Sequence, residues 1–177
     1  FYVGNYVNAT LLTIFVIILF CYMYSYLNKE TTAHYLVALI FIPIYGLMNI
    51  IAYSIQISIV PQTAQIEILS NSMNGISQHL IQANSKSLMG FINGMAYALL
   101  SIPSIIFGIG LYKDYKKYSG ICFIASGIAS DIGIIGYLLG DSLISTGIMI
   151  SGVIFLIGLV FIVIEFRSTR NLTISST

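Results

Sequence analysis

The chain has 177 residues and a formal net charge of +1; 58% of its residues are hydrophobic and only 7% are charged. Soluble domains carry about 25% charged residues, so this composition and a mean hydropathy of +0.94 exclude a water-soluble globular protein. The near-neutral charge also argues against a nucleic-acid partner, because binding to phosphates needs many basic residues. We therefore expect a membrane protein that forms one integral membrane domain over residues 1–177.

Five apolar stretches are long enough to cross a hydrocarbon core of ~30 Å as helices, which takes roughly 20 residues each. They cover about residues 6–27, 35–60, 88–112, 121–139 and 143–166. The first has no basic segment before it and no small-residue cleavage site after it, so we interpret it as a span rather than a signal peptide. All five are too long and too continuously apolar for barrel strands. The predicted fold is all-α, a polytopic bundle of five transmembrane helices.

The second span carries a polar stripe that contains Asn49 and Tyr53. Together with Tyr45 and Gln56, these residues recur at spacings of three and four. At ~100° per residue they fall within an arc of ~80° on one helix face. We expect this face to point toward protein rather than lipid.

The connection between the second and third spans, residues 61–87, is the longest in the chain and carries its own apolar stripe. The stripe recurs at helical spacing and consists of Ile66, Leu69, Met73, Ile76 and Leu80. This pattern predicts one amphipathic helix that lies on the outer membrane interface. A lid over a cavity is the alternative, since long ordered loops sometimes serve that purpose.

The third span repeats a pattern of the second. Residues 46–53 and 90–97 both read glycine, two apolar residues, asparagine, two residues, alanine, tyrosine. Consecutive spans run in opposite directions, so Asn49 is expected at the level of Tyr97, and Tyr53 at the level of Asn93. Inverted repeats of this kind place binding sites near the midplane of many transporters. The alternative is structural, because buried Asn and Tyr side chains also hold helices together at about 0.6 kcal/mol per hydrogen bond.

The fourth span contains Asp131, the only charged residue near the centre of a long apolar stretch. It is the eleventh residue of the run from 121 to 139, so it lies ~15 Å deep, at the midplane of the bilayer. A carboxylate at that depth costs several kcal/mol unless it is protonated, paired or hydrated. Asp131 is therefore a candidate functional residue.

Small residues spaced four apart recur on the third, fourth and fifth spans, where they allow helix backbones to approach closely. They are Gly90 with Gly94, Gly136 with Gly140, and Gly147 with Ser151. This spacing favours either a tightly packed bundle or association with partner membrane helices, including a homo-oligomer.

The basic residues give the orientation. Six fall on one side of the membrane under alternating topology, and only Lys86 falls on the other; the six are Lys29, Lys113, Lys116, Lys117, Arg167 and Arg170. The positive-inside rule then places the N-terminus outside and the C-terminus in the cytoplasm. We interpret Glu165, beside two of these arginines, as part of a snorkelling cluster that fixes this topology.

No residue pattern points to a metal or a cofactor. Cys21 and Cys122 each lie inside an apolar run, and their spacing matches no metal site. His34 and His79 are expected on opposite membrane faces, so one small ligand cannot contact both. We expect no cofactor and no metal ion.

Three functions are compatible with these features. The first is a small transporter, channel or ligand-binding bundle in which Asp131 meets Asn49 and Tyr97 near the midplane. The second is a non-catalytic scaffold or accessory subunit that associates through glycine-rich helix faces. An intramembrane lipid-modifying enzyme ranks lowest, because one acid has no catalytic partner. A polar, water-sized cavity that contains the three residues would favour the first function, and a dry interface would favour the second.

Overall fold

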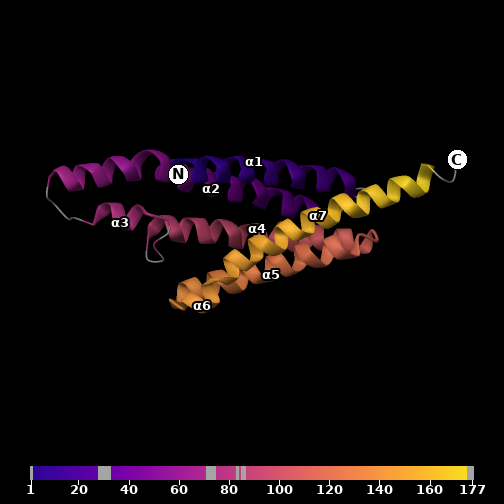
Figure 1. The fold of residues 1–177 in the computed structure, drawn as a ribbon. Helices are drawn as coiled ribbons and strands as arrows, with labels where there is room; N and C mark the ends of the chain where they lie inside the picture. Colours follow the sequence, from indigo (N-terminus) through magenta and orange to yellow (C-terminus); the bar gives the residue numbers. More distant parts are fainter. Residues whose placement is uncertain (1, 28–32, 71–74, 83, 85–86, 175–177) are drawn as a thin grey trace.

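The chain forms five long helices and two short ones in a computed structural model that describes residues 2–27, 33–70, 75–82, 84 and 87–174 (Figure 1). The long helices are α1 (Tyr2–Leu27), α2 (Ala33–Leu69), α4 (Leu88–Lys113), α5 (Lys117–Leu139) and α7 (Gly147–Ile174), and the short ones are α3 (Ile76–Leu80) and α6 (Ser142–Ser145). No strand occurs in these residues, which confirms the all-α class. Five of the described helices are long and apolar enough to cross a membrane, which suggests membrane embedding.

The helix ends follow local signals in the sequence. The Ser87 hydroxyl accepts a hydrogen bond from the Gly90 amide at 2.9 Å and so caps the start of α4. At the end of α5, Gly140 adopts a φ of 73°, a left-handed conformation that glycine enters without steric cost. The Asp141 carboxylate then accepts from the Leu143 and Ile144 amides and starts α6. This tight turn brings α7 back along α5.

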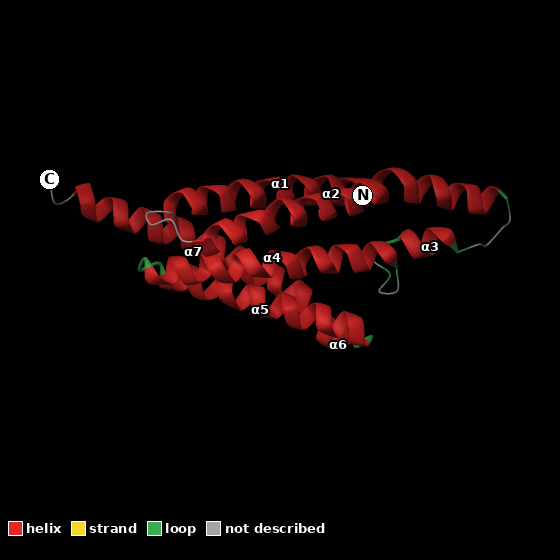
Figure 2. Cartoon of the chain, turned by 180° about the vertical axis from the view of Figure 1, so that it is seen from behind, coloured by secondary structure: helices red, strands yellow, loops and turns green. Residues whose placement is uncertain are grey.

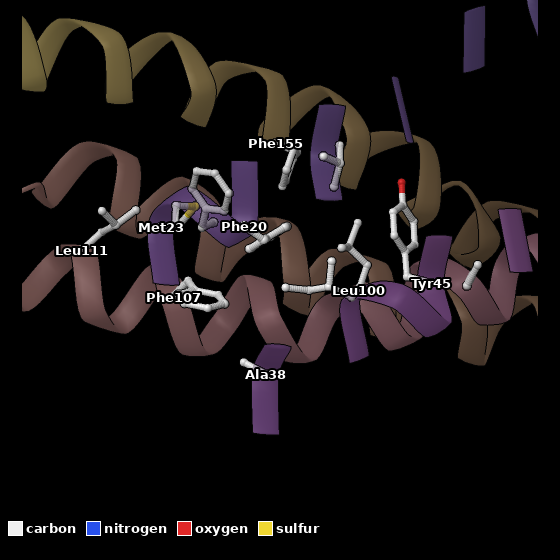
Figure 3. Close-up of a cluster of buried hydrophobic side chains, with 12 residues drawn as sticks. Phe20, Met23, Ala38, Tyr45, Leu100, Phe107, Leu111 and Phe155 are labelled. Carbon is white, nitrogen blue, oxygen red and sulfur yellow. The ribbon is translucent and has the colours of Figure 1, made fainter. Parts of the chain in front are cut away.

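Helix α4 lies between α2 and α5, while α7 packs on α5 and α1 packs mainly on α2 (Figure 2). The centre of the hydrophobic core is an aromatic cluster to which four helices contribute. The Phe20 ring of α1 lies 5.5 Å from Phe107 of α4, 6.1 Å from Phe123 of α5 and 6.1 Å from Phe155 of α7 (Figure 3). These rings hold α1 and α7 on the same side of the α4–α5 pair.

The segment between α2 and α4 differs from the amphipathic helix that we predicted there. Helix α2 continues through Pro61 to Leu69, and the chain then turns at Gly75, whose φ is 68°. The apolar stripe is thereby divided, because Ile66 and Leu69 end α2 whereas Ile76 and Leu80 lie on α3; Met73 falls outside the described residues. A single helix across this segment is therefore wrong. The left-handed turn at Gly75 interrupts the helical run that the spacing predicted.

Hydrogen bonds hold the two pieces of this segment together. The Glu67 carboxylate accepts from the Ile76 amide at 2.7 Å and from the Ser77 hydroxyl at 2.5 Å, so the end of α2 caps the start of α3. The buried Gln56 side chain donates to the Leu80 carbonyl at 2.6 Å, and its amide oxygen accepts from the Gln82 backbone amide at 3.1 Å. The segment thus returns alongside α2 (Figure 1).

Candidate functional site

Two polar stripes meet between α2 and α4: the predicted stripe of α2 and, on α4, Asn93 and Tyr97 of the repeated pattern. All four stripe residues of α2 are buried, namely Tyr45, Asn49, Tyr53 and Gln56. The Tyr53 hydroxyl lies 3.4 Å from the hydroxyl of Tyr97 on α4, which is half-buried. The contact between the two stripes therefore forms, but its closest polar pair joins two tyrosines. No hydrogen bond between Asn49 and Tyr97 is present among the described residues, and the buried Asn93 side-chain oxygen has no hydrogen-bond partner there.

A second group of polar atoms surrounds Tyr45. The Tyr45 hydroxyl lies beside the Thr13 side chain of α1 and beside the Asn49 side chain, which is one turn further along α2. The Tyr97 ring packs edge-on against the Tyr45 ring, with 5.9 Å between the ring centroids. Asn49 has no solvent exposure, and within the described part of the chain neither its side-chain oxygen nor its nitrogen makes a hydrogen bond of ordinary geometry. Burial of an unpaired amide costs about 1–3 kcal/mol. The contact of Asn49 with the Tyr45 hydroxyl offsets at most part of this cost.

Beside this polar group a groove of about 300 Å³ runs between α1 and α7. Its apolar walls come from both helices and from α4, and they include Leu12, Val16, Leu100, Met149, Phe155 and Leu156. The side chains of Tyr45, Tyr97, Ser126 and Ser151 add hydroxyl groups. Figure 3 shows Tyr45 and Leu100 pointing toward the side from which Phe155 approaches. The groove is thus mainly apolar with a few hydroxyl-bearing side chains in its lining, a composition common to small-molecule sites.

The groove lies near the mid-length of α4 and α5. Tyr97 is nine residues from the start of α4, and Ser126 is nine residues from the start of α5. At ~1.5 Å rise per residue, both lie ~14 Å from the helix ends. If these helices cross a bilayer, the groove opens inside the hydrocarbon layer.

A smaller apolar pocket of about 260 Å³ lies in the same gap between α1 and α7, toward the end of the bundle where α1 ends. Its lining is almost entirely apolar and includes Leu19, Met23, Leu111, Ile162 and Phe166. The contact between Phe20 and Phe155 lies between this pocket and the groove. The gap therefore extends over several helical turns, although aromatic side chains divide it.

The α5–α7 contact closes one side of the groove. The Ser126 hydroxyl donates to the Ser151 carbonyl at 3.0 Å, and the two hydroxyl oxygens lie 3.2 Å apart. Both serine side chains are buried. These hydroxyls, unlike the Asn49 amide, have their hydrogen-bonding needs met within the chain.

Asp131 is half-buried on α5, but it does not line the groove. It lies five residues after Ser126, which places it ~140° around the helix from that groove residue. Among the described residues it makes no hydrogen bond or ion pair, and no described contact joins it to Asn49 or Tyr97. The structure brings Tyr53 and Tyr97 together and keeps Asn49 nearby, whereas Asp131 stands apart from this group.

Two of the glycines that we predicted at helix contacts pack within the chain. A Cβ atom on Gly136 would lie 2.5 Å from the Ser145 amide nitrogen, and one on Gly147 would lie 2.7 Å from the Ala129 carbonyl oxygen. Backbone thus touches backbone where α5 meets α6 and α7. These two positions are occupied inside one molecule and are not available to a partner helix.

The other three predicted glycines differ in their surroundings. A Cβ on Gly94 would meet the Ile134 side chain at 3.0 Å, and one on Gly90 would meet the Asn84 carbonyl oxygen at 2.9 Å. Gly140 has open space around it, and it serves to end α5 rather than to pack.

The start of α5 has a carboxylate cap that sequence reasoning missed. Glu165 of α7 accepts hydrogen bonds from the Tyr118 amide at 3.0 Å and from the Ser119 hydroxyl at 2.5 Å. A carboxylate satisfies free amide groups at a helix start and interacts favourably with the helix dipole. The partners lie 46 or more residues apart, so no local pattern announced this role for Glu165.

Most of the described basic residues gather at this end of the bundle. The Tyr26 hydroxyl of α1 donates to the Asp114 carboxylate at 2.5 Å, so the end of α1 meets the α4–α5 connection that carries Lys113, Lys116 and Lys117. The contact of Glu165 with α5 brings the end of α7, with Arg167, to the same place. Lys29 and Lys86 fall outside the described residues, as does the side chain of Arg170.

No group of three or more His, Cys, Asp and Glu side chains comes together in the described residues in a way that would hold a metal ion. Comparison with protein-family models, with curated proteins and with solved structures gives no match to this chain. The function therefore has to be argued from the site itself.

Proposed function

We propose that this chain is a multi-pass integral membrane protein that binds an apolar ligand in the groove between α1 and α7. The observation that carries the proposal is the groove itself, which has apolar walls, hydroxyl-bearing residues in its lining and a position near the mid-length of α4 and α5, two of the five membrane-length helices. In the proposed orientation the N-terminus is external, and the basic end of the bundle faces the cytoplasm. The proposal includes no catalytic step.

Two features favour this proposal over the other candidate functions. Asp131 lies outside the groove, so the binding site uses hydroxyl and amide groups and not a titrating carboxylate. Gly136 and Gly147 pack within the chain, so the glycine faces that a scaffold would present to partner helices are already occupied. The groove between α1 and α7 is not filled by the chain itself, so it remains available to a ligand.

The proposal can be tested by fluorescence, because the chain contains no tryptophan. Leu12 lines the groove and is 48% exposed, so Leu12→Trp introduces a single reporter there. The detergent-solubilised variant is titrated with dibromooctadecane, whose bromines quench tryptophan on contact. We expect saturable quenching of this reporter. We expect only gradual, unsaturated quenching of Ile132→Trp, on the exposed face of α5, because annular contact has no fixed stoichiometry.

A substitution that fills the groove provides the matched test. A Cβ on Gly152, which lines the groove, meets nothing within 4 Å, so Gly152→Leu adds bulk there without a clash. Gly4 has equally open surroundings on α1 but lies outside the groove, so Gly4→Leu is the control. Binding should be lost in the first variant and kept in the second. Saturable quenching that survives Gly152→Leu would exclude the groove as the binding site.

A further inference from the structure

The polar side chains of the groove lie in two places, at Tyr45 and Tyr97 and at the α5–α7 contact, where Ser126 and Ser151 bond to each other. Tyr45 contributes to the groove lining and its hydroxyl lies beside Thr13 and Asn49, whereas most other lining residues are aliphatic or aromatic. A site for a pure hydrocarbon gains nothing from buried hydroxyl and amide groups, which cost free energy when they leave water. The wall at Tyr45 therefore points to a ligand with a polar atom.

The hydrogen-bonding capacity of this wall exceeds what the chain supplies. The Thr13 hydroxyl donates to the Ala9 carbonyl at 2.9 Å, so its proton is already used. The fully buried Asn49 amide has two donors and an acceptor, and among the described residues none of them is paired. One additional oxygen near the Tyr45 hydroxyl would let Tyr45 and Asn49 rearrange into a satisfied network. Asn49 is fully buried and does not itself line the groove, so a ligand oxygen would connect to this amide through the Tyr45 hydroxyl, which Asn49 contacts.

The depth of the site decides the charge of the ligand. At ~14 Å from the helix ends the groove lies in the hydrocarbon layer of the proposed bilayer, where a charged group costs several kcal/mol. The described lining residues of the groove include no Asp, Glu, Lys, Arg or His that would offset that cost. A phospholipid headgroup is therefore excluded from this depth, whereas a neutral hydroxyl or carbonyl oxygen is tolerated.

We infer that the ligand is a neutral amphiphile, a long hydrocarbon chain that ends in a hydroxyl or carbonyl oxygen, with that oxygen hydrogen-bonded at Tyr45 beside Asn49. Its hydrocarbon chain lies against Leu12, Val16 and Leu156 on the groove walls. This inference rests on the proposed function and specifies its ligand class.

The test compares three probes on the Leu12→Trp reporter in detergent: dibromooctadecanol, dibromooctadecane, and a phosphatidylcholine with a dibrominated acyl chain. We expect the alcohol to bind about three- to tenfold more tightly than the alkane, which corresponds to one hydrogen bond in an apolar environment. The phosphatidylcholine should quench without saturation, since its headgroup stays at the interface. In Tyr45→Phe and in Asn49→Leu the preference for the alcohol should fall to about one.

A tyrosine outside the groove supplies the control. Tyr137 donates to the Ser87 carbonyl at 3.2 Å near one end of the bundle, so Tyr137→Phe also removes a single hydroxyl but should leave the alcohol preference unchanged. If the alcohol and the alkane bind equally well to the unsubstituted groove, the ligand class is wrong while the proposed function stands. If neither binds saturably, the proposed function is wrong as well. Saturable binding of the phosphatidylcholine would overturn the neutral ligand class in favour of a phospholipid.

Discussion

Helices α5 and α7 are held together by close backbone contact, whereas α1 rests on α2 and α4 through large side chains. Between α5 and α7, Gly133 and Gly147 place no Cβ at the contact, so the two backbones approach closely there. On the α1 side, Tyr45, Tyr53 and Phe20 separate the helices, and a groove stays open. Small residues thus leave no space to fill, while large polar residues leave both space and unpaired atoms.

The strongest test of this comparison is to add one methyl group on each side. In Gly133→Ala the new Cβ would overlap the Ile148 backbone nitrogen, so the helices must move apart. We expect a loss of about 2–4 kcal/mol, typical of overpacking against rigid structure. Gly152→Ala, on the groove side of α7, should be neutral or stabilising by up to about 1 kcal/mol, because alanine favours helix. Reversible unfolding in mixed micelles measures both. Equal losses would contradict the comparison.

The next largest effect is expected at the end of the close-packed pair. Glu165→Ala removes the carboxylate that caps α5 and should lower stability by about 1–2 kcal/mol. Glu165→Gln keeps an acceptor oxygen and should lose less, because only the charge is removed. Arg167→Ala, two residues away and exposed, should change stability by no more than about 0.5 kcal/mol. If Glu165→Ala loses no more stability than Arg167→Ala, the cap contributes nothing.

A smaller effect is expected where the close-packed pair borders the groove. Ser126→Ala removes the hydrogen bond to the Ser151 carbonyl and should cost about 0.6 kcal/mol, the average for such bonds between membrane helices. The measurement is the shift of the unfolding midpoint in SDS, with Ser58→Ala as the control. Ser58 is exposed and bonds only to the Ser54 carbonyl of its own helix, so its replacement should cause no shift. A shift of equal size in both variants would mean that the Ser126 bond contributes nothing between the helices.

The smallest change in stability is expected next to the groove, where a substitution should maintain or raise stability rather than lower it. Asn49→Leu removes a buried amide that has no described partner, so stability without ligand should stay the same or rise by up to about 1 kcal/mol. The same unfolding assay applies, in detergent freed of lipid. A clear loss of stability would show that Asn49 has a structural bond in the protein, and the contrast with Ser126 would then disappear.

Asp131→Asn tests whether the one midplane acid takes part in binding. Asp131 does not line the groove, so the affinity of the Leu12→Trp reporter for dibromooctadecanol should be unchanged by this substitution. The measurement is the dissociation constant for dibromooctadecanol in the Leu12→Trp protein with and without Asp131→Asn. A loss of more than about threefold, equivalent to one interhelical hydrogen bond, would return the carboxylate to the binding mechanism.

Much of the fold could be predicted because hydrophobic length is a property of single segments. The spans predicted at 88–112 and 121–139 correspond closely to α4 (Leu88–Lys113) and α5 (Lys117–Leu139). The extension of α2 was missed because Pro61 marks a helix end in many sequences. Proline removes only one amide donor, and the residues after it suit a helix, so α2 continues for two more turns.

The candidate site was harder to predict because it depends on how helices are ordered and rotated. The depth of Asp131 and its angle to Ser126 follow from counting residues, but which of the two faces the groove depends on which side of α5 meets α7. The polar stripe of α2 predicted a buried face, yet the closest partner of Tyr97 is Tyr53 rather than Asn49. The groove exists because α4 separates the α1–α2 pair from the α5–α7 pair, an order that no local pattern encodes.

Helix α2 has 37 residues and is therefore ~55 Å long, which exceeds the ~40–45 Å of a bilayer with its headgroups. One continuous helix thus connects Tyr45, inside the proposed bilayer, with the exposed Leu69, which lies beyond the hydrocarbon layer in the proposed orientation. A tilt of ~5° about Asn49 displaces Leu69, ~30 Å away, by ~3 Å. A spin label at position 69 would therefore report a change in the tilt of α2 at the groove, although the label itself lies far from the groove.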